Sequence, residues 1–150
     1  MISKELIANV KKAEGFRLTA YKDTLGFWTV GYGHKLAEGH DWTGYTITPD
    51  YAVALLEIDL NSALLECTPL AEWLRLGTPA RQDAVIELVY NMGLGGYKTF
   101  IRTRNAMATQ QWQAVHDNLL ASLWARQVGP TRSNRIANQL LTGTYGNALV

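Results

Sequence analysis

Two carboxylates near the N-terminus are the first candidates for chemistry in this sequence of 150 residues. Glu14 ends a helix-like segment, and Asp23 follows nine residues later in a turn-forming run. The carbonyl groups at a helix C-terminus make the local potential negative, which favours the protonated form of Glu14. A better-solvated turn favours the ionised form of Asp23. Two carboxyl groups that differ in this way can hydrolyse a glycosidic bond, although on spacing alone they are more simply two solvated surface charges.

The residues after Asp23 give the pair a more specific setting. Thr29 follows six residues later, across the Leu25-Gly26 turn. We expect its hydroxyl to return to the Asp23 carboxylate and to help hold a water molecule. Gly31, in the same strand, has no side chain, so a bulky ligand ring can approach the backbone there.

The elements that must position these residues are predicted from caps and helix breakers. Ser3 can cap a first helix, which should stop at Glu14-Gly15 with the glycine in a left-handed conformation. Residues 20–47 are rich in glycine and aromatic residues, which favours short hairpin strands. Thr48-Pro49 then begins a long helix that runs to about Glu66.

Helix continues over the rest of the chain. Thr78-Pro79 begins a second long helix, which the cluster Gly93, Gly95 and Gly96 should end. Three shorter helices are predicted at residues 99–107, 109–121 and 131–141, with Gly143 closing the last.

This order predicts an α+β fold that is mainly α, with residues 1–150 forming a single domain. A small β-lobe covers about residues 15–48, and a linking helix covers about 49–66. The larger helical lobe takes residues 1–13 and 67–150. We expect a ligand-binding cleft between the two lobes, because binding sites favour such junctions.

Composition limits the class of protein. The chain is 47% hydrophobic and 18% charged, as in soluble globular proteins. Cys67 is the only cysteine, so an internal disulfide is excluded, and no zinc-like Cys/His spacing occurs. We therefore expect no metal and no cofactor. The sequence lacks a secretory signal and an apolar run of the ~20 residues that span a bilayer, which indicates a cytosolic origin without a membrane anchor.

The net charge of +1 conceals an asymmetry between the two ends of the chain. No acid follows Asp117, whereas three arginines do, namely Arg126, Arg132 and Arg135, and three more cations lie just upstream of it, namely Lys98, Arg102 and Arg104. Such a portion suggests a polyanionic partner, namely nucleic acid, an anionic membrane face or a cell-wall polymer, or else an ordinary solvated helix face.

Several motifs in order along almost the whole chain closely resemble the phage-type lysozymes, glycoside hydrolase family 24. The first three are Glu14-Gly-Phe-Arg-Leu, Tyr21-Lys-Asp-Thr and Trp28-Thr-Val-Gly-Tyr-Gly-His34. The others are Leu56-Glu-Ile-Asp59, Val89-Tyr-Asn-Met-Gly93, Ser122-Leu-Trp124, Pro130-Thr-Arg-Ser-Asn-Arg135 and Thr142-Gly-Thr-Tyr145. Most specific is the spacing of glutamate, eight residues, aspartate, five residues and threonine.

The resemblance implies a lysozyme fold and an endo-acting muramidase that cleaves the MurNAc–GlcNAc β-1,4 bond of peptidoglycan. It implies that Glu14 is the general acid, that Asp23 activates a water molecule and that Thr29 helps to place that water. A hydroxyl beside the base suits a held water better than a nucleophile that touches the sugar. We therefore expect inversion at the anomeric carbon, which requires a wide separation of the two carboxylates.

The resemblance also implies substrate contacts and one structural pair. The substrate-contacting positions are Lys35, where an apolar residue was expected, Tyr90, Thr103 and Asn118. Arg132 is implied to face Glu14 across the cleft. His34 is implied to pair with Asp59 on the long helix, a structural role rather than a catalytic one.

Other functions remain open from the sequence. A lytic transglycosylase acts on the same bond without water, but it has no use for Asp23 and Thr29. An inactive cell-wall-binding or virion structural module is a second alternative. Nucleic acid is not the expected partner, because no recognised motif accompanies the arginines. As implied partners we expect peptidoglycan glycan strands and a holin-like pore, which would release a monomeric enzyme from the host cytoplasm to the periplasm.

Overall fold

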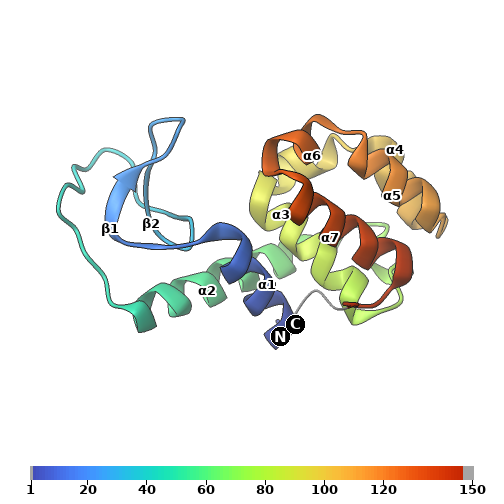
Figure 1. Cartoon of the computed structure of the whole chain (residues 1–150), viewed down its shortest axis with the longest axis horizontal. Coiled ribbons are helices and arrows are strands. Elements are labelled where there is room, and N and C mark those ends of the chain that lie inside the picture. The colour runs from blue at the N-terminus through green and yellow to red at the C-terminus, as the bar shows by residue number, and fades with distance from the viewer. Residues whose placement is uncertain (1, 147–150) are drawn as a thin grey trace. The chain divides into compact units, whose positions relative to one another are not determined.

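The computed structural model describes residues 2–146 and divides into two compact units, residues 1–61 and 62–150 (Figure 1). The chain is mainly helical and contains one small antiparallel sheet, so the predicted α+β class is confirmed. Helix α1 groups with the sheet in the first unit, whereas residues 1–13 were expected to group with the later helices. Folding of residues 1–150 as one domain stays a prediction.

Helix α1, Lys4–Glu14, begins and ends where its caps predict. The Ser3 hydroxyl accepts a hydrogen bond from the amide of Leu6 at 3.0 Å, which satisfies one of the free donors at a helix start. Gly15 ends the helix with a φ of 59° but a ψ of −179°, so it is not in the left-handed helical conformation that was expected. The extended ψ sends the chain directly into the first strand.

The sheet contains β1 (Arg17–Lys22), β2 (Trp28–Gly31) and β3 (His34–Lys35) in sequential antiparallel order. Tyr21 pairs with Thr29, and Thr29 in turn pairs with Lys35. The register is irregular between Arg17 and Tyr21 and regular beyond it, next to the turn. The expected hairpins between residues 20 and 47 are therefore present.

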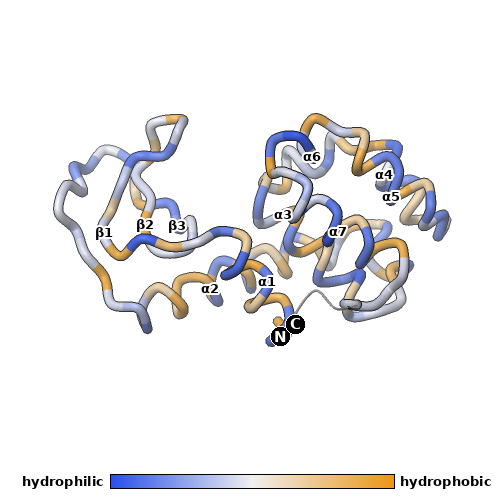
Figure 2. The backbone as a smooth tube through the Cα atoms, in the orientation of Figure 1, coloured by the Kyte–Doolittle hydropathy of each residue, from blue (hydrophilic) through white to orange (hydrophobic). Residues whose placement is uncertain are grey.

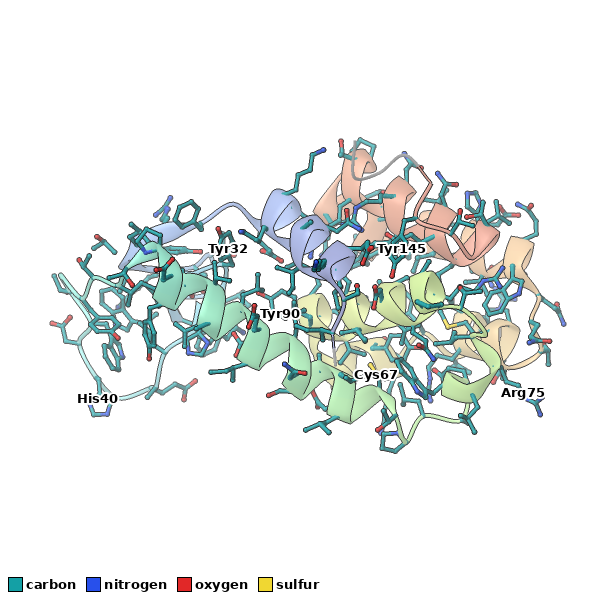
Figure 3. The ribbon with its side chains drawn as sticks, turned by 90° about the horizontal axis from the view of Figure 1, so that it is seen from below. Tyr32, His40, Cys67, Arg75, Tyr90 and Tyr145 are labelled. Carbon is teal, nitrogen blue, oxygen red and sulfur yellow. The ribbon has the colours of Figure 1, made fainter. Side chains whose placement is uncertain are left out.

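Helix α2, Pro49–Cys67, starts with the predicted cap, because the Thr48 hydroxyl accepts a hydrogen bond from the amide of Tyr51 at 3.1 Å. The sheet meets this helix closely at Gly31. A Cβ atom at Gly31 would lie 3.4 Å from the Cβ of Ala52, and the φ of Gly31 is +67°. Both conditions favour glycine at this position. The loop between β3 and α2 carries the exposed His40 (Figure 3).

The second unit contains η1 (Trp73–Arg75), α3 (Pro79–Lys98), α4 (Ile101–Ala108), α5 (Trp112–Leu120), α6 (Leu123–Val128) and α7 (Pro130–Thr142). Polar and apolar residues alternate along α7, as Figure 2 shows. Its buried residues include Ile136, Ala137 and Leu140. Gly143 closes α7 in a left-handed conformation, as predicted.

Two helical segments in this unit were not predicted. The first long helix breaks at Gly93, as predicted, with a φ of 77° and a ψ of 158°, but a second helical segment of α3 follows and runs to Lys98. Tyr97 lies in this last segment, is 1% exposed and donates a hydrogen bond to Glu72 at 2.7 Å. Tertiary contacts thus hold residues that the local sequence would release. Helix α6 was not predicted, because it has only six residues.

Trp73 and Trp124 lie in helical segments, where their apolar rings are expected to pack in the core, and both are buried, with exposures of 9% and 6%. Trp112 is only partly buried, and the Arg81 guanidinium lies 3.9 Å from the centroid of its ring. Cys67 is fully buried. Among residues 2–146, no helix combines the length and the apolar composition that a membrane crossing requires.

Candidate active site

Glu14 is the last residue of α1 and is half-buried. The amide of Gly15 bonds to the carbonyl of Lys11 at 3.3 Å, so the final turn of the helix is closed directly beside the carboxylate. Lys11 and Lys12 lie in the same turn, where cations offset the negative end of the helix dipole. Glu14 is therefore placed at a helix terminus and next to the first strand, as the sequence predicts.

The Asp23 carboxylate is fixed by the turn between β1 and β2. Its Oδ1 atom accepts hydrogen bonds from the amides of Leu25 and Phe27, each at 2.9 Å. The main chain closes the same turn, because the amide of Asp23 donates to the carbonyl of Phe27 at 2.9 Å. Gly26 permits this path with a φ of +87°.

One oxygen of Asp23 is therefore held, while the other remains available. Within residues 2–146 the structure gives Oδ2 no hydrogen-bond donor. Asp23 is only partly buried, so this oxygen can accept a proton from water. A carboxylate with one fixed and one open oxygen has the arrangement that a general base requires.

Thr29 is buried, with an exposure of 4%, and its hydroxyl donates to the carbonyl of Phe27 at 3.0 Å. The expectation that this hydroxyl returns to the Asp23 carboxylate is wrong, since no hydrogen bond joins the two side chains. The reason is local, because the hydroxyl donates its hydrogen to the carbonyl two residues earlier in the chain. With its hydrogen committed, Thr29 Oγ1 can still accept a hydrogen bond from a water molecule.

Lys35 lies directly opposite Thr29 in the sheet and is exposed. Residues that pair directly across strands project from the same face, so Lys35, Thr29 and Tyr21 share one face. The Nζ atom of Lys35 lies 4.9 Å from the centroid of the Phe27 ring. The expected substrate-contacting lysine is thus a neighbour of the Asp23 turn.

Phe27 connects these groups, and sequence reasoning did not identify it. Its amide holds Asp23, its carbonyl holds the Thr29 hydroxyl and its ring lies under the Lys35 ammonium. Its position four residues after the aspartate, at the end of a Gly-containing turn, is the signal that could have found it.

His34 and Asp59 join β3 to α2 inside the first unit. The distance from His34 Nδ1 to Asp59 Oδ2 is 2.8 Å, and both side chains are 26% exposed. The hydrogen bond to Asp59 raises the pKa of His34 above its ordinary value, and burial opposes this only in part. The pair thus connects sheet to helix, and the expected role of His34 is structural.

The remaining predicted site residues, Tyr90, Thr103, Asn118 and Arg132, belong to the second unit. Thr103 and Asn118 line the same pocket, which has a volume of about 680 Å³. Gln127 and Trp124 contribute to its wall. The Trp124 indole donates to Asn91 Oδ1 at 2.8 Å, which fixes this side of the pocket. Thr103 and Asn118 are therefore neighbours at one pocket of the second unit.

Arg132 contacts an acid that the sequence did not identify. Its Nε donates to Glu87 Oε2 at 2.9 Å, and Arg135 binds both oxygens of the same carboxylate at 2.9 and 2.7 Å. Glu87 is 1% exposed. The spacing of the two arginines, three residues apart on one helix, was the available signal, since such residues lie on one face.

These ion pairs also correct the interpretation of the basic C-terminal portion. Arg104 bonds to Glu72 at 2.6 and 3.0 Å, as Arg132 and Arg135 bond to Glu87. Half of the six noted cations therefore neutralise buried acids within the protein. Lys98, Arg102 and Arg126 are exposed. The charge asymmetry thus reflects internal pairing as well as surface charge, which weakens the case for a polyanionic partner.

No group of three or more potential metal-ligating side chains occurs among residues 2–146. The chemistry available at the first unit is that of its carboxylates, hydroxyl and ammonium. Glu14, Asp23, Thr29 and Lys35 all fall within residues 1–61.

Comparisons with known proteins support the resemblance to the phage-type lysozymes. The family model described as "Phage lysozyme" matches residues 11–138. The chain is 28% identical to "Probable T4-type lysozyme 1" of Dictyostelium discoideum, over 90% of this chain and 92% of that protein. It is 32% identical to the "Endolysin" of Salmonella phage P22, over 83% and 84%. It is also 28% identical to the "Pre-baseplate central spike protein Gp5" of Enterobacteria phage T4, over 91% of this chain but only 28% of that protein.

Proposed function

Because the chain belongs to the phage lysozyme family, we propose that it is an endo-acting muramidase that hydrolyses the MurNAc–GlcNAc β-1,4 bond of bacterial peptidoglycan. The family model and the endolysin relatives support the general part of this proposal, that the protein is a lysozyme that hydrolyses peptidoglycan. The proposal adds the bond, the residues and the stereochemistry. Its partners are glycan strands, without nucleic acid, a metal or a cofactor.

In the proposed reaction Glu14 donates its proton to the glycosidic oxygen as the bond to C1 of MurNAc breaks. Water forms the new bond at C1, and its proton passes to Asp23 Oδ2. Thr29 Oγ1 accepts a hydrogen bond from the same water and so fixes its direction. Each catalytic proton transfer of this kind contributes about 10²–10⁴-fold to the rate.

The observation that carries the proposal is the anchoring of Asp23. Two amides hold Oδ1, and the buried Thr29 hydroxyl has its hydrogen committed to Phe27. Asp23 Oδ2 and Thr29 Oγ1 can both accept a hydrogen bond from one water molecule and so orient it for attack. A carboxylate that bonds to the sugar itself would not need the hydroxyl. This supports inversion, with the α-anomer as the first product.

Digestion of purified sacculi, followed by mass and NMR analysis of the products, tests this chemistry. Hydrolysis leaves reducing MurNAc ends, whereas a lytic transglycosylase would leave anhydro ends lighter by one water. The first anomer formed separates inversion from retention. Anhydro ends, or β-anomer first, would contradict the proposed mechanism.

A second candidate role is attachment to a virus particle, and one comparison favours it. The chain matches a segment, 28% of the length, of a protein named as a baseplate spike. Free lysis activity would require passage from the host cytoplasm through a holin-like pore to the periplasm, where a monomer would act. Expression with and without a pore-forming protein separates the two, because a free enzyme should lyse cells only when the pore is present.

Substrate contacts are proposed for Lys35, Tyr90, Thr103, Asn118 and Arg132. The shared pocket of Thr103 and Asn118 supports their assignment. Alanine variants of either residue should raise KM for peptidoglycan more than they lower kcat, measured on solubilised strands.

A further inference from the structure

The face of the sheet that carries Thr29 also carries an exposed cation, Lys35. Lys35 lies directly opposite Thr29, and directly opposed residues have Cβ atoms about 4.5–5.5 Å apart. The extended side chain of a lysine spans roughly the same distance again. Its ammonium is thus within reach of a sugar bound at the water-holding Thr29.

The Lys35 ammonium is oriented but not neutralised. It lies 4.9 Å from the centroid of the Phe27 ring, which attracts it without forming a hydrogen bond. Within the described residues 2–146 Lys35 makes no ion pair and no side-chain hydrogen bond. Its three N–H donors therefore remain available to an anionic partner.

Phe27 ties this cation to the reaction centre. The same residue supplies the amide that holds Asp23 Oδ1 and the carbonyl that accepts from Thr29. A group bound to Lys35 is consequently held in a fixed relation to the carboxylate and hydroxyl that would place the attacking water.

From this juxtaposition we propose that Lys35 binds a carboxylate of the peptide stem carried by the MurNAc unit under attack. The inference rests on the proposed function, because it assumes that C1 of MurNAc reacts beside Asp23 and Thr29. The sugar rings of the strand are neutral, whereas the stem attached to the lactyl group of MurNAc carries free carboxylates. The stem is therefore the part of this substrate that complements an unpaired ammonium.

Lys22 provides a matched control. It is exposed and its Nζ lies 5.4 Å from the centroid of the Trp28 ring. It pairs directly with Trp28, one position along from the Tyr21–Thr29 pair, so it projects from the opposite face of the sheet. Lys22→Met and Lys35→Met thus remove the same charge and the same kind of ring contact from two faces of one sheet.

The experiment measures kcat and KM for the wild type, Lys35→Met, Lys35→Arg and Lys22→Met on two soluble substrates. One is intact glycan strands with their peptide stems, and the other is the same strands after an amidase has removed the stems and carbodiimide coupling to methylamine has converted the freed lactyl carboxylates to neutral amides. Thermal unfolding checks that every variant is folded.

On intact strands Lys35→Met should raise KM about tenfold with kcat within about twofold, as expected for one lost charge-assisted hydrogen bond. The KM of Lys35→Arg should stay within about threefold of the wild-type value. Lys22→Met should have the same kcat and KM as the wild type. On stem-free strands the wild type and Lys35→Met should have the same kcat and KM.

Three outcomes would overturn the inference. An equal loss by Lys35→Met on both substrates would assign Lys35 to the sugar or to the reaction itself. An equal loss by Lys22→Met would indicate general electrostatic attraction, and an unchanged KM for Lys35→Met would exclude the contact. A wild type that releases no reducing ends from either substrate would instead refute the proposed function, and the inference with it.

Discussion

Replacing Glu87 with glutamine should strongly destabilise the protein. Glu87 is 1% exposed and binds both Arg132 and Arg135. These side chains are themselves only 9% and 13% exposed. The amide keeps the shape of the carboxylate but removes the negative charge that both nearly buried cations share.

The size of the effect follows from the burial. Removing one partner of a buried ion pair costs about 3–5 kcal/mol. Arg135 keeps a second hydrogen bond, to Gln139 Oε1 at 2.9 Å, so the lower end of the range, about 3 kcal/mol, is expected. For a chain of this length that corresponds to a melting temperature lower by roughly 6–12 °C.

Urea unfolding at neutral pH measures the loss directly, provided that the slope of the transition is unchanged. Glu66→Gln is the control, because Glu66 is exposed and the exchange is chemically the same. A triple variant with methionine at all three positions should recover much of the lost stability, since apolar packing can replace a buried ion network. A loss below about 1 kcal/mol for Glu87→Gln would refute the reasoning.

Four further predictions concern the site and its supports. Glu14→Gln should keep the fold and lose about 10²–10⁴-fold in kcat or more; a variant that keeps a tenth of the rate would contradict the acid assignment. Thr29→Ala should lower kcat with KM nearly unchanged in a muropeptide-release assay, and a rise in KM alone would assign Thr29 to binding. His34→Ala should destabilise most below about pH 6.5, because the raised pKa of His34 makes the charged pair complete there, and the deficit should shrink as pH rises through the folded pKa; urea unfolding across pH tests this, and a constant deficit would reject it. Cys67, whose pKa burial raises to about 12, should resist thiol reagents at pH 8 until the protein is unfolded.

Local signals predicted most element boundaries. Ser3 and Thr48 cap helices through hydrogen bonds to amides three residues away, and Thr78 does the same for α3. Such contacts lie within one turn of the chain, so residue type and spacing suffice to locate them. The hairpins follow for the same reason, because their turns contain the glycine and aspartate that turn geometry favours.

Contacts between distant residues could not be predicted in this way. The partner of Arg132 lies 45 residues earlier in the chain, and that of Arg104 lies 32 residues earlier. No periodicity connects such pairs, so the sequence did not predict Glu87 and Glu72 as the partners of these arginines. Tyr97 shows the same limit, since it lies in the helical segment that follows the kink at Gly93 and its partner Glu72 lies 25 residues earlier.

In the candidate site the sequence predicted the residue types, whereas the turn determines how they are used. The Asp23 carboxylate was expected to be held by a side chain, but main-chain amides of Leu25 and Phe27 hold it instead. These amides converge only because Gly26 takes a φ of +87° between them, a conformation that is easy for glycine alone. The Thr29 hydroxyl is oriented by a carbonyl of the same turn. The specific spacing of aspartate, five residues and threonine is therefore a requirement of the turn backbone: one residue more or less would move the amides away from Oδ1 and turn Thr29 to the opposite face of the sheet.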